Sequence, residues 1–221
     1  MLLSEKAFQF DYRFSIAIDG PSASGKSHLS QILAKKLKLK YVESGIFYRF
    51  FAKICLNKNI LPTKDSVLKS NILDDVDLFE EKIDFIDLRD EEISIYASQI
   101  AIIPELRSKI NNHLKKLVIS YNRVVMEGRD IAKIVLPNAD LKIFLTADIK
   151  ERASRRSKQF LSEGKNLDFS DILSKLRFRD NVDTYRETDP LSKVDSSLVL
   201  DSTFLTLEAL LEKILLFIQS R

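Results

Sequence analysis

Short runs rich in apolar and β-branched residues recur along the chain, separated by longer segments with helical spacing. The runs are FSIAID (14–19), KYVE (40–43), RVVME (123–127), LKIFLT (141–146) and SLVLDS (197–202). In 27–40, 105–121 and 205–220, apolar residues recur three and four positions apart, which is typical of amphipathic helices. Near-continuous apolar strands that alternate with helices indicate a parallel sheet covered on both faces. We therefore expect a three-layer α/β fold with a five-stranded parallel sheet.

The chain is long enough for one domain with a sizeable core, because it has 221 residues. Residues 57–91 break the alternation, since DDVDLFEE and KIDFIDL are acidic and strand-like. We expect a small β-containing insert there, within a single domain that spans residues 1–221. The first dozen residues match no expected element and are predicted to form a loose tail.

The charge balance argues against a broad surface for polyanions, because 35 basic and 32 acidic side chains nearly cancel to +3. Cys55 is the only cysteine, which excludes an internal disulfide and fits a reducing compartment. No uncharged run approaches the roughly 18 residues that span a bilayer, and the first residues lack the apolar centre of a signal peptide. We expect a cytoplasmic monomer with no nucleic-acid or membrane partner.

The segment GPSASGKS (20–27) follows the first apolar run and precedes a helical segment. It matches GxxxxGK[ST] in the strand-to-helix context that a phosphate-binding loop requires. In such a loop, Lys26 spans the β- and γ-phosphates and the Ser27 hydroxyl ligates magnesium. Glu127 or Asp19 is expected to hold the water shell of that ion. The predicted nucleotide-binding residues of this loop are Gly20, Pro21, Ser22, Ala23, Ser24, Gly25, Lys26 and Ser27.

Three classes of protein use a loop of this kind. A GTPase switch also needs DxxG and NKxD elements, but no DxxG occurs here and NKNI (57–60) lacks the aspartate. A mechanical or nucleic-acid ATPase is typically larger or carries an extended basic surface. A small-molecule kinase needs an acceptor pocket beside the γ-phosphate and an arginine-bearing flap that excludes water. The remaining motifs supply what a kinase needs.

Polar segments with arginine follow two of the predicted strands. ESGIFYR (43–49) follows the second strand and EGRDIA (127–132) the third, so both lie at the carboxyl edge where α/β proteins bind ligands. A third segment, RDNVDTYRETDPL (179–191), spaces two arginines and an aspartate at 0, +4 and +7, along one helical face. Arginines clustered at a strand edge suit a phosphate dianion.

These segments, in this order, resemble the bacterial-type cytidylate kinases of the nucleoside monophosphate kinase family. The resemblance runs from Ile16 to the last helix and rests on IAIDGPSASGKS, SGIFYR, ASQIAIIPELR, EGRDI, LPNADLKIFLTA, ERASRR, RDNVDTYR and LVLDST. It implies a P-loop kinase fold with a monophosphate-binding insert at about 57–91 and a short helical lid at about 152–180. It also implies transfer of the γ-phosphate of MgATP to CMP or dCMP, giving ADP and CDP or dCDP.

The resemblance further implies a role for each matching residue. The acceptor phosphate is expected to bind Ser44, Arg49, Arg129 and Arg186. The sugar is expected to contact Arg179 and Asp183. Cytosine is expected to be read by Ser98, Arg107 and Asp130. The donor side of the lid is expected to use Arg152 and Arg156. The residues expected to act directly in catalysis are Lys26, Arg129, Arg156 and Arg186.

The chemistry of cytosine agrees with this assignment. Its N4 amino group is a donor that the Asp130 carboxylate can accept, and N3 and O2 are acceptors for Arg107 and Ser98. Ala132 and Lys133, which border this pocket, stand where the family has a Gly-Thr pair. Two alternatives stay open from the sequence: a P-loop kinase for another monophosphate or small metabolite, and a nucleotide-dependent binding module without an acceptor.

Overall fold

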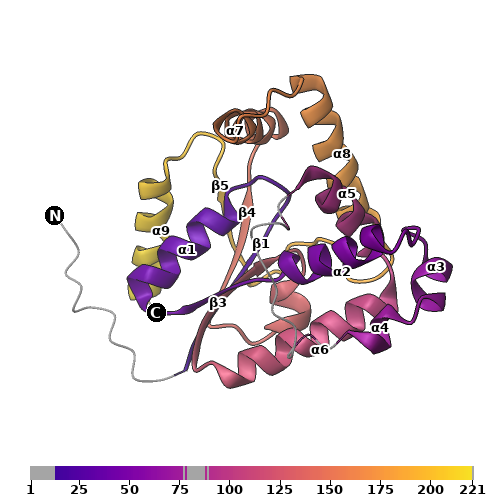
Figure 1. Cartoon of the computed structure of the whole chain (residues 1–221). Helices are drawn as coiled ribbons and strands as arrows, with labels where there is room; N and C mark the ends of the chain where they lie inside the picture. Colours follow the sequence, from indigo (N-terminus) through magenta and orange to yellow (C-terminus); the bar gives the residue numbers. More distant parts are fainter. Residues whose placement is uncertain (1–12, 77, 79–87, 89, 221) are drawn as a thin grey trace.

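The computed structural model describes residues 13–76, 78, 88 and 90–220, which form a layered α/β structure (Figure 1). Its centre is a sheet of five parallel strands in the order β2-β3-β1-β4-β5. The strands are β1 (Phe14–Asp19), β2 (Lys40–Glu43), β3 (Arg123–Gly128), β4 (Leu141–Thr146) and β5 (Leu198–Asp201). These bounds agree with the predicted strands to within one residue at each end. The predicted five-stranded parallel sheet is confirmed.

Helices make up most of the remaining described chain. They are α1 (Lys26–Leu37), α2 (Gly45–Asn57), α3 (Lys64–Lys69), α4 (Ile72–Asp75), α5 (Glu91–Ile100), α6 (Pro104–Ser120), α7 (Ile149–Ser162), α8 (Phe169–Tyr185) and α9 (Leu207–Gln219), with a π-helical turn at Ile131–Val135. Side-chain caps start several of them: Asp148 accepts the Lys150 N–H before α7, and Asp168 accepts the Ser170 N–H before α8. None of the helices in the described ranges is long and apolar enough to cross a membrane.

Alternate residues of the central strands pack against different helices, and this produces the three layers. Ile16 and Ile18 of β1 join the apolar cluster beneath α1 and α9, whereas Ala17 joins the cluster with α2, α5 and α6. In β3, Val125 faces the first cluster and Met126 the second. All five side chains are buried. Because both faces of these strands are covered, their sequences are continuous apolar runs and not alternating ones.

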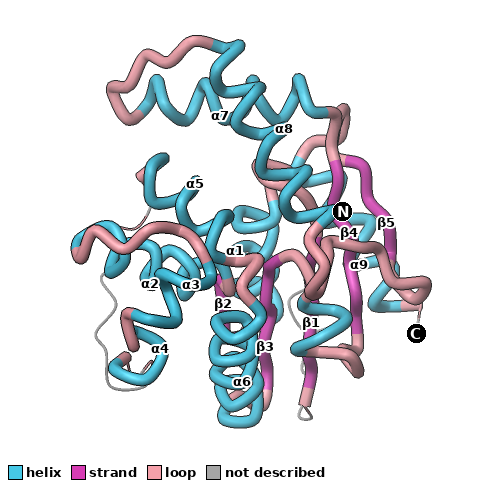
Figure 2. The backbone as a smooth tube through the Cα atoms, turned by 90° about the vertical axis from the view of Figure 1, so that its right-hand side faces the viewer, coloured by secondary structure: helices cyan, strands magenta, loops and turns pink. Residues whose placement is uncertain are grey.

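The parallel strands end at one common edge of the sheet, and this edge carries the segments singled out in the sequence. The glycine-rich loop leaves β1 there, and α2 begins directly after β2. Helices α7 and α8 pack against each other above this edge, as Figures 1 and 2 show from two sides. The range predicted for the lid, 152–180, falls on these two helices and the loop between them.

The longest described stretch of the predicted insert, residues 57–76, consists of short helices and the loops between them. It contains α3 and α4, and Thr63 caps α3 by accepting the N–H of Ser66. The strand-like segment KIDFIDL (82–88) lies outside the described residues except for Leu88, which is buried. The predicted tail at 1–12 also lies outside them. The β content of the insert therefore stays a prediction.

Candidate active site

A cleft of about 600 Å³ lies at the carboxyl edge of the sheet, between the glycine-rich loop, α2, α5, α7 and α8. It brings together most of the residues selected from the sequence. The predicted site residues that line it are Ser22, Ala23, Gly25, Lys26, Ser27, Ser44, Arg49, Ser98, Arg107, Arg129, Asp130, Arg156, Arg179, Asp183 and Arg186. The predicted site residues that do not line it are Gly20, Pro21, Ser24 and Arg152.

The glycine-rich loop packs tightly against the sheet. A Cβ atom added to Gly20 would lie 2.0 Å from the backbone oxygen of Leu145 in β4, so only glycine fits there. Gly25 has a φ of 96°, in the left-handed region that favours glycine, and directly precedes α1. The Nζ atom of Lys26 folds back over the loop and donates to the backbone oxygen of Pro21 at 2.7 Å. The loop thus has the turn that phosphate binding needs, with its lysine over it.

Lys26 is 5% exposed and lies among charged groups of both signs. Burial and, less strongly, the nearby Arg129 guanidinium lower the pKa of Lys26 to about 7, although Glu127 and Asp183 oppose the shift. The ammonium group is therefore only partly charged at neutral pH when no anion is beside it. A bound polyphosphate would favour the charged form.

This arrangement predicts that ATP binding takes up a proton. At pH 8 the free Lys26 is mostly neutral, because burial lowers its pKa to about 7, and phosphate oxygens beside it raise that pKa again. We expect uptake of about one proton per site at pH 8. The measurement is calorimetry of ATP binding in buffers with different ionisation enthalpies. Lys26→Met is the control, and uptake that persists in it would assign the proton to another group.

A hydroxyl and a carboxylate lie together at the start of α1. Ser27 donates to Oε1 of Glu127, at the end of β3, at 2.6 Å, and Tyr41 donates to the same oxygen at 3.2 Å. Glu127 is buried. Oxygen donors of these two types are the ligands that magnesium prefers. The pair Ser27 and Glu127 therefore fits a magnesium ion on the phosphate side of the cleft.

Asp19, the other carboxylate considered for magnesium, binds backbone N–H groups with both of its oxygens. Its Oδ1 accepts the backbone N–H of Ile131 at 2.9 Å and its Oδ2 that of Ala132 at 2.8 Å. Burial raises the pKa of Asp19 to about 6. With both oxygens bonded to the backbone, Asp19 fixes the turn after β3, which carries Arg129 and Asp130. Of the two candidates, Glu127 is the carboxylate beside Ser27.

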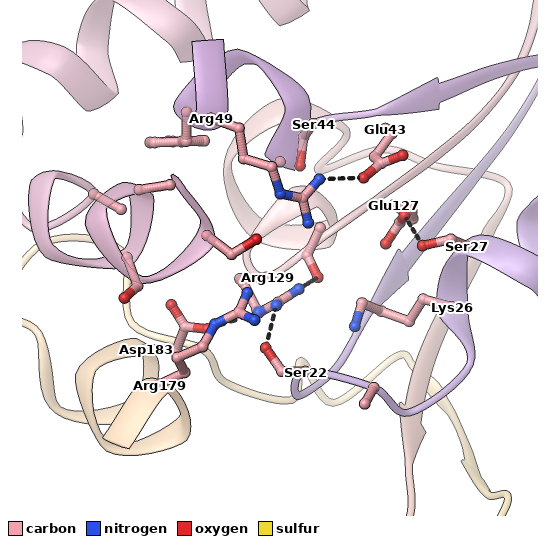
Figure 3. A pocket seen from close by; sticks show the side chains of 18 of the residues that line it. Ser22, Lys26, Ser27, Glu43, Ser44, Arg49, Glu127, Arg129, Arg179 and Asp183 are labelled. Atoms are coloured by element: carbon pink, nitrogen blue, oxygen red, sulfur yellow. Dashed lines mark hydrogen bonds and ion pairs between the residues drawn. The ribbon is translucent and has the colours of Figure 1, made fainter. Parts of the chain in front are cut away.

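Arginines from three elements converge in the middle of the cleft (Figure 3). Arg129 donates to Asp183 at 2.7 Å and to the Ser22 hydroxyl of the glycine-rich loop at 3.0 Å. Arg49 forms an ion pair of 2.5 Å with Glu43. Among the described residues, the buried Nε of Arg179 has no hydrogen-bond partner.

The electrostatics of these arginines indicate an anion site. Burial, together with the neighbouring Arg129 and Arg49, lowers the pKa of Arg179 to about 10. Like charges held together without enough carboxylates to balance them are costly, and a phosphate dianion relieves that cost. Arg179, predicted to contact the sugar, thus lies close to the two arginines predicted to hold the phosphate.

Arg186 lines the cleft, but it does not extend the helical face predicted for 179–186. Helix α8 ends at Tyr185, and Arg186 follows it with extended backbone angles. It still reaches back to Asp183, whose Oδ1 accepts from Nη1 at 3.2 Å. This contact forms through the turn after the helix, so the helical spacing predicted for Arg186 is wrong.

Arg107 and Asp130 form a buried ion pair of 2.5 Å at the other end of the cleft. Arg107 comes from α6 and Asp130 from the turn after β3, so two distant segments meet there. Ser98 of α5 also lines the cleft, three residues before Ala101, whose backbone oxygen accepts from Nη1 of Arg107 at 3.0 Å. The Ser98 hydroxyl donates to the backbone oxygen of Ile95 at 2.7 Å. Three residues selected from the sequence as readers of one base therefore lie in one part of the cleft.

The arginines of α7 differ in where they point. Arg156 lines the cleft, pairs with Glu91 of α5 at 2.8 Å and stacks on the Phe160 ring. Arg152 is buried outside the cleft lining, where it donates to the backbone oxygen of Ser22 at 3.0 Å and to Asp180 at 2.6 Å. In this arrangement Arg152 ties α7 and α8 to the glycine-rich loop, and its predicted contact with the donor stays a prediction.

Among the residues that were not selected from the sequence, two that line the cleft and one that contacts a cleft residue are notable. Arg155 lines the cleft and donates to the Ser202 hydroxyl at 2.9 Å, and only its place in ERASRR could have suggested it. Tyr48 lines the cleft with its ring 5.6 Å from Cζ of Arg107. Asp189 accepts from Nε of Arg107 at 3.1 Å. No local pattern distinguishes Tyr48 or Asp189, because their partners lie far away in the sequence.

The fold and the loop together define the class of protein. A parallel sheet of order 2-3-1-4-5, a GxxxxGK[ST] loop after β1 and two arginine-bearing helices above the strand ends are the parts of a P-loop kinase. The confirmed features are the sheet and the position of the loop. The cleft beside the loop has room and charge for a second anionic substrate.

Comparison with known proteins identifies the family. The sequence model of the family described as cytidylate kinase matches residues 16–220. The cytidylate kinase of Rickettsia bellii (strain OSU 85-389) is 42% identical over 216 residues, which cover 98% of this chain and 97% of the relative. That of Rickettsia akari (strain Hartford) is 41% identical over 222 residues, covering 99% and 98%. The chain belongs to the cytidylate kinase family.

A solved structure supports the fold alone. An uncharacterized protein from Eubacterium ventriosum ATCC 27560 superposes with a TM-score of 0.56 at 15% identity, covering 95% of this chain and 100% of that one. At this identity the similarity concerns the arrangement of strands and helices and says nothing about the substrate.

Proposed function

We propose that this protein transfers the γ-phosphoryl group of ATP to CMP or dCMP, giving ADP and CDP or dCDP. The observation that carries the proposal is the arrangement of one cleft: a phosphate-binding loop at one end, an arginine cluster in the middle and the Arg107–Asp130 pair at the other end. Donor phosphates, acceptor phosphate and acceptor base each have a matching group there. Membership of the cytidylate kinase family supports the same substrate.

The acceptor is held by charge at one end and by hydrogen bonds at the other. Its phosphate binds the arginine cluster together with the Ser44 hydroxyl, which lines the cleft after β2. Its cytosine donates from N4 to the Asp130 carboxylate and accepts from Arg107 and Ser98. Uracil presents an oxygen at position 4, which would face that carboxylate without a proton between them. The proposed site therefore prefers cytosine. The sugar lies between these ends, beside Arg179 and Asp183.

The donor lies along the glycine-rich loop. Backbone N–H groups of the loop and the start of α1 bind the phosphates, and Lys26 neutralises charge on the transferring group. Ser27 and Glu127 would hold magnesium, which supplies further charge neutralisation at the phosphates. Arg156 adds positive charge from α7 once its pairing with Glu91 gives way to the donor.

The reaction needs no dedicated general base. The second pKa of a phosphate monoester is about 6, so the attacking oxygen of the acceptor is already anionic near neutral pH. The new bond forms between that oxygen and the γ-phosphorus while the bond from phosphorus to the β-bridging oxygen breaks. Catalysis then depends on in-line positioning, charge neutralisation and exclusion of water by α7 and α8. One chain supplies every group of the proposed site, so we propose a monomer.

The test is ADP formation from MgATP with CMP, dCMP, UMP, AMP, GMP and dTMP offered one at a time. We expect kcat/KM for CMP and dCMP to exceed that for UMP and dTMP by at least about 10-fold, because of these pyrimidines only cytosine has an amino donor for Asp130. Preferred turnover of another monophosphate would keep the phosphate sites and discard the base assignment. ATP hydrolysis without any acceptor would favour a binding module, and no turnover at all would favour a kinase for another metabolite.

A further inference from the structure

Asp189 is a half-buried carboxylate to which none of the roles above applies. It lies in the loop after α8, with 21% of its side chain exposed. Its Oδ2 accepts from Nε of Arg107 at 3.1 Å and from Nδ2 of Asn111 at 3.4 Å. Its backbone oxygen accepts from Nε and Nη2 of Arg186 at 2.8 Å and 2.5 Å. One residue therefore holds two arginines that serve different parts of the cleft.

The backbone at Asp189 makes this double contact feasible. Its φ is 49°, in the left-handed region that aspartate tolerates better than most residues. In this conformation the side chain reaches α6 while the carbonyl oxygen reaches Arg186. The N–H of Leu191 donates to the backbone oxygen of Asp183 at 2.7 Å and ties the loop back to α8. The carboxylate is thus presented from a fixed turn.

Arg107 is 1% exposed and meets a different acceptor at each nitrogen. Nε bonds to Asp189, Nη1 to the backbone oxygen of Ala101 at 3.0 Å, and Nη2 to Oδ2 of Asp130 at 2.5 Å. The ring of Tyr48 lies 5.6 Å from Cζ. A guanidinium has five N–H groups. These contacts leave one N–H on each terminal nitrogen for the base.

The Asp189 carboxylate determines which oxygen of Asp130 pairs with Arg107. An arginine and a single carboxylate favour a bidentate pair, which engages both oxygens. With Nε held by Asp189, Arg107 reaches only Oδ2 of Asp130. Oδ1 of Asp130 lies 3.7 Å from Nη2 of Arg186, too far for a hydrogen bond. That oxygen keeps its lone pairs for an amino group of a ligand.

We propose that Asp189 is the positioning residue that sets base discrimination, an inference that rests on the proposed function. Its carboxylate holds Arg107 in the pairing that leaves Oδ1 of Asp130 for the N4 amino group of cytosine. Its carbonyl oxygen separately holds Arg186 at the acceptor phosphate. Replacing the side chain removes the first contact and leaves the second.

The variant Asp189→Ala tests whether the side chain of Asp189 acts on the base and its carbonyl oxygen on the phosphate. We expect kcat/KM for CMP to fall about 10-fold, and the preference for CMP over UMP to fall by a similar factor. The kcat at saturating CMP and the KM for ATP should stay within about 3-fold of wild type, because the phosphate groups keep their contacts. Asp189→Asn keeps an acceptor oxygen and tolerates the left-handed backbone, so it should restore most of the preference. Glu187→Ala, an exposed carboxylate in the same loop, is the matched control.

The outcomes separate this proposal from the proposed function. The wild-type protein tests the function alone, because that proposal fails if CMP is not preferred. The role of Asp189 is tested by comparing Asp189→Ala with wild type. The quantity compared is the preference for the favoured monophosphate over the others, whichever monophosphate wild type prefers. An unchanged preference in Asp189→Ala would overturn the positioning role. An equal loss with every acceptor and a lowered Tm would also overturn it, since a structural role alone would produce that result.

Discussion

Lys26→Ala is expected to lower kcat for phosphoryl transfer by at least about 1,000-fold, which is the loss typical of removing a cation from the transferring phosphoryl group. The Lys26 ammonium group lies over the glycine-rich loop, where the donor phosphates bind in the proposed complex. The KM for CMP should change little, because the acceptor groups lie on other elements. The measurement is steady-state ADP formation at saturating CMP and ATP.

The protein itself should tolerate this change. Burial disfavours the charged form of Lys26 and lowers its pKa to about 7, so its removal takes away a costly charge together with two hydrogen bonds, to the Pro21 backbone oxygen and the Ser24 hydroxyl. We expect the Tm without nucleotide to stay within a few degrees of wild type. Lys35→Ala, at an exposed position of the same helix, should leave kcat unchanged. A Lys26→Ala protein with nearly normal kcat would show that the loop does not hold the transferring phosphate.

Local pattern was enough to predict the sheet and the phosphate loop. A strand buried on both faces needs an apolar side chain at every position, as Ile16, Ala17 and Ile18 show, and such a run is visible without any partner. The phosphate loop is also recognisable from local sequence, because its two glycines, its lysine and its last serine lie within eight consecutive residues. Strand bounds agreed to within one residue for this reason.

Contacts between distant segments left no such pattern. Asp19 accepts the backbone N–H groups of Ile131 and Ala132, more than a hundred positions away. From the sequence, Asp19 and Glu127 were equally suitable for magnesium. ERASRR offered three arginines at helical spacing, and only packing against Ser22 and Asp180 separates Arg152 from the two that line the cleft. Which face of a helix meets which loop is decided by tertiary packing, which periodicity does not encode.

The resemblance to a family supplied roles that physics alone would not have assigned. Nothing in EGRD by itself says that Asp130 meets Arg107 of α6, yet the structure brings them to 2.5 Å. The helical spacing of 179–186 predicted that Arg186 lies on a helix. In the structure Arg186 lies just beyond it, because α8 ends at Tyr185. The motifs thus predicted which residues gather in the cleft. The contacts that orient these residues, such as those of Asp189, are visible only in the structure.

Arg129→Ala is expected to lower kcat by at least about 100-fold while leaving the fold intact. Arg129 lies at the boundary between donor and acceptor, bonded to Ser22 of the loop at 3.0 Å and to Asp183 at 2.7 Å. In the proposed reaction it neutralises charge on both phosphates at the point of transfer. Arg129→Lys should not restore the rate, because lysine has a single nitrogen where Nε and Nη2 of Arg129 reach Asp183 and Ser22 separately. The measurement is single-turnover transfer, which separates chemistry from release of products.

Stability and proton uptake distinguish this role from a structural one. Arg129 repels Arg179 and Lys26, whose pKa values it helps to lower, although Asp183 and Glu127 raise the pKa of Arg129 itself despite its burial. Its removal relieves that repulsion, while Asp183 keeps Arg186 as a partner, so the Tm should not fall by more than a few degrees. The pKa of Lys26 should rise, and the proton taken up with ATP at pH 8 should shrink accordingly. Arg177→Ala, at an exposed position of α8, should change neither quantity. A large loss of Tm with unchanged proton uptake would instead assign Arg129 to the fold.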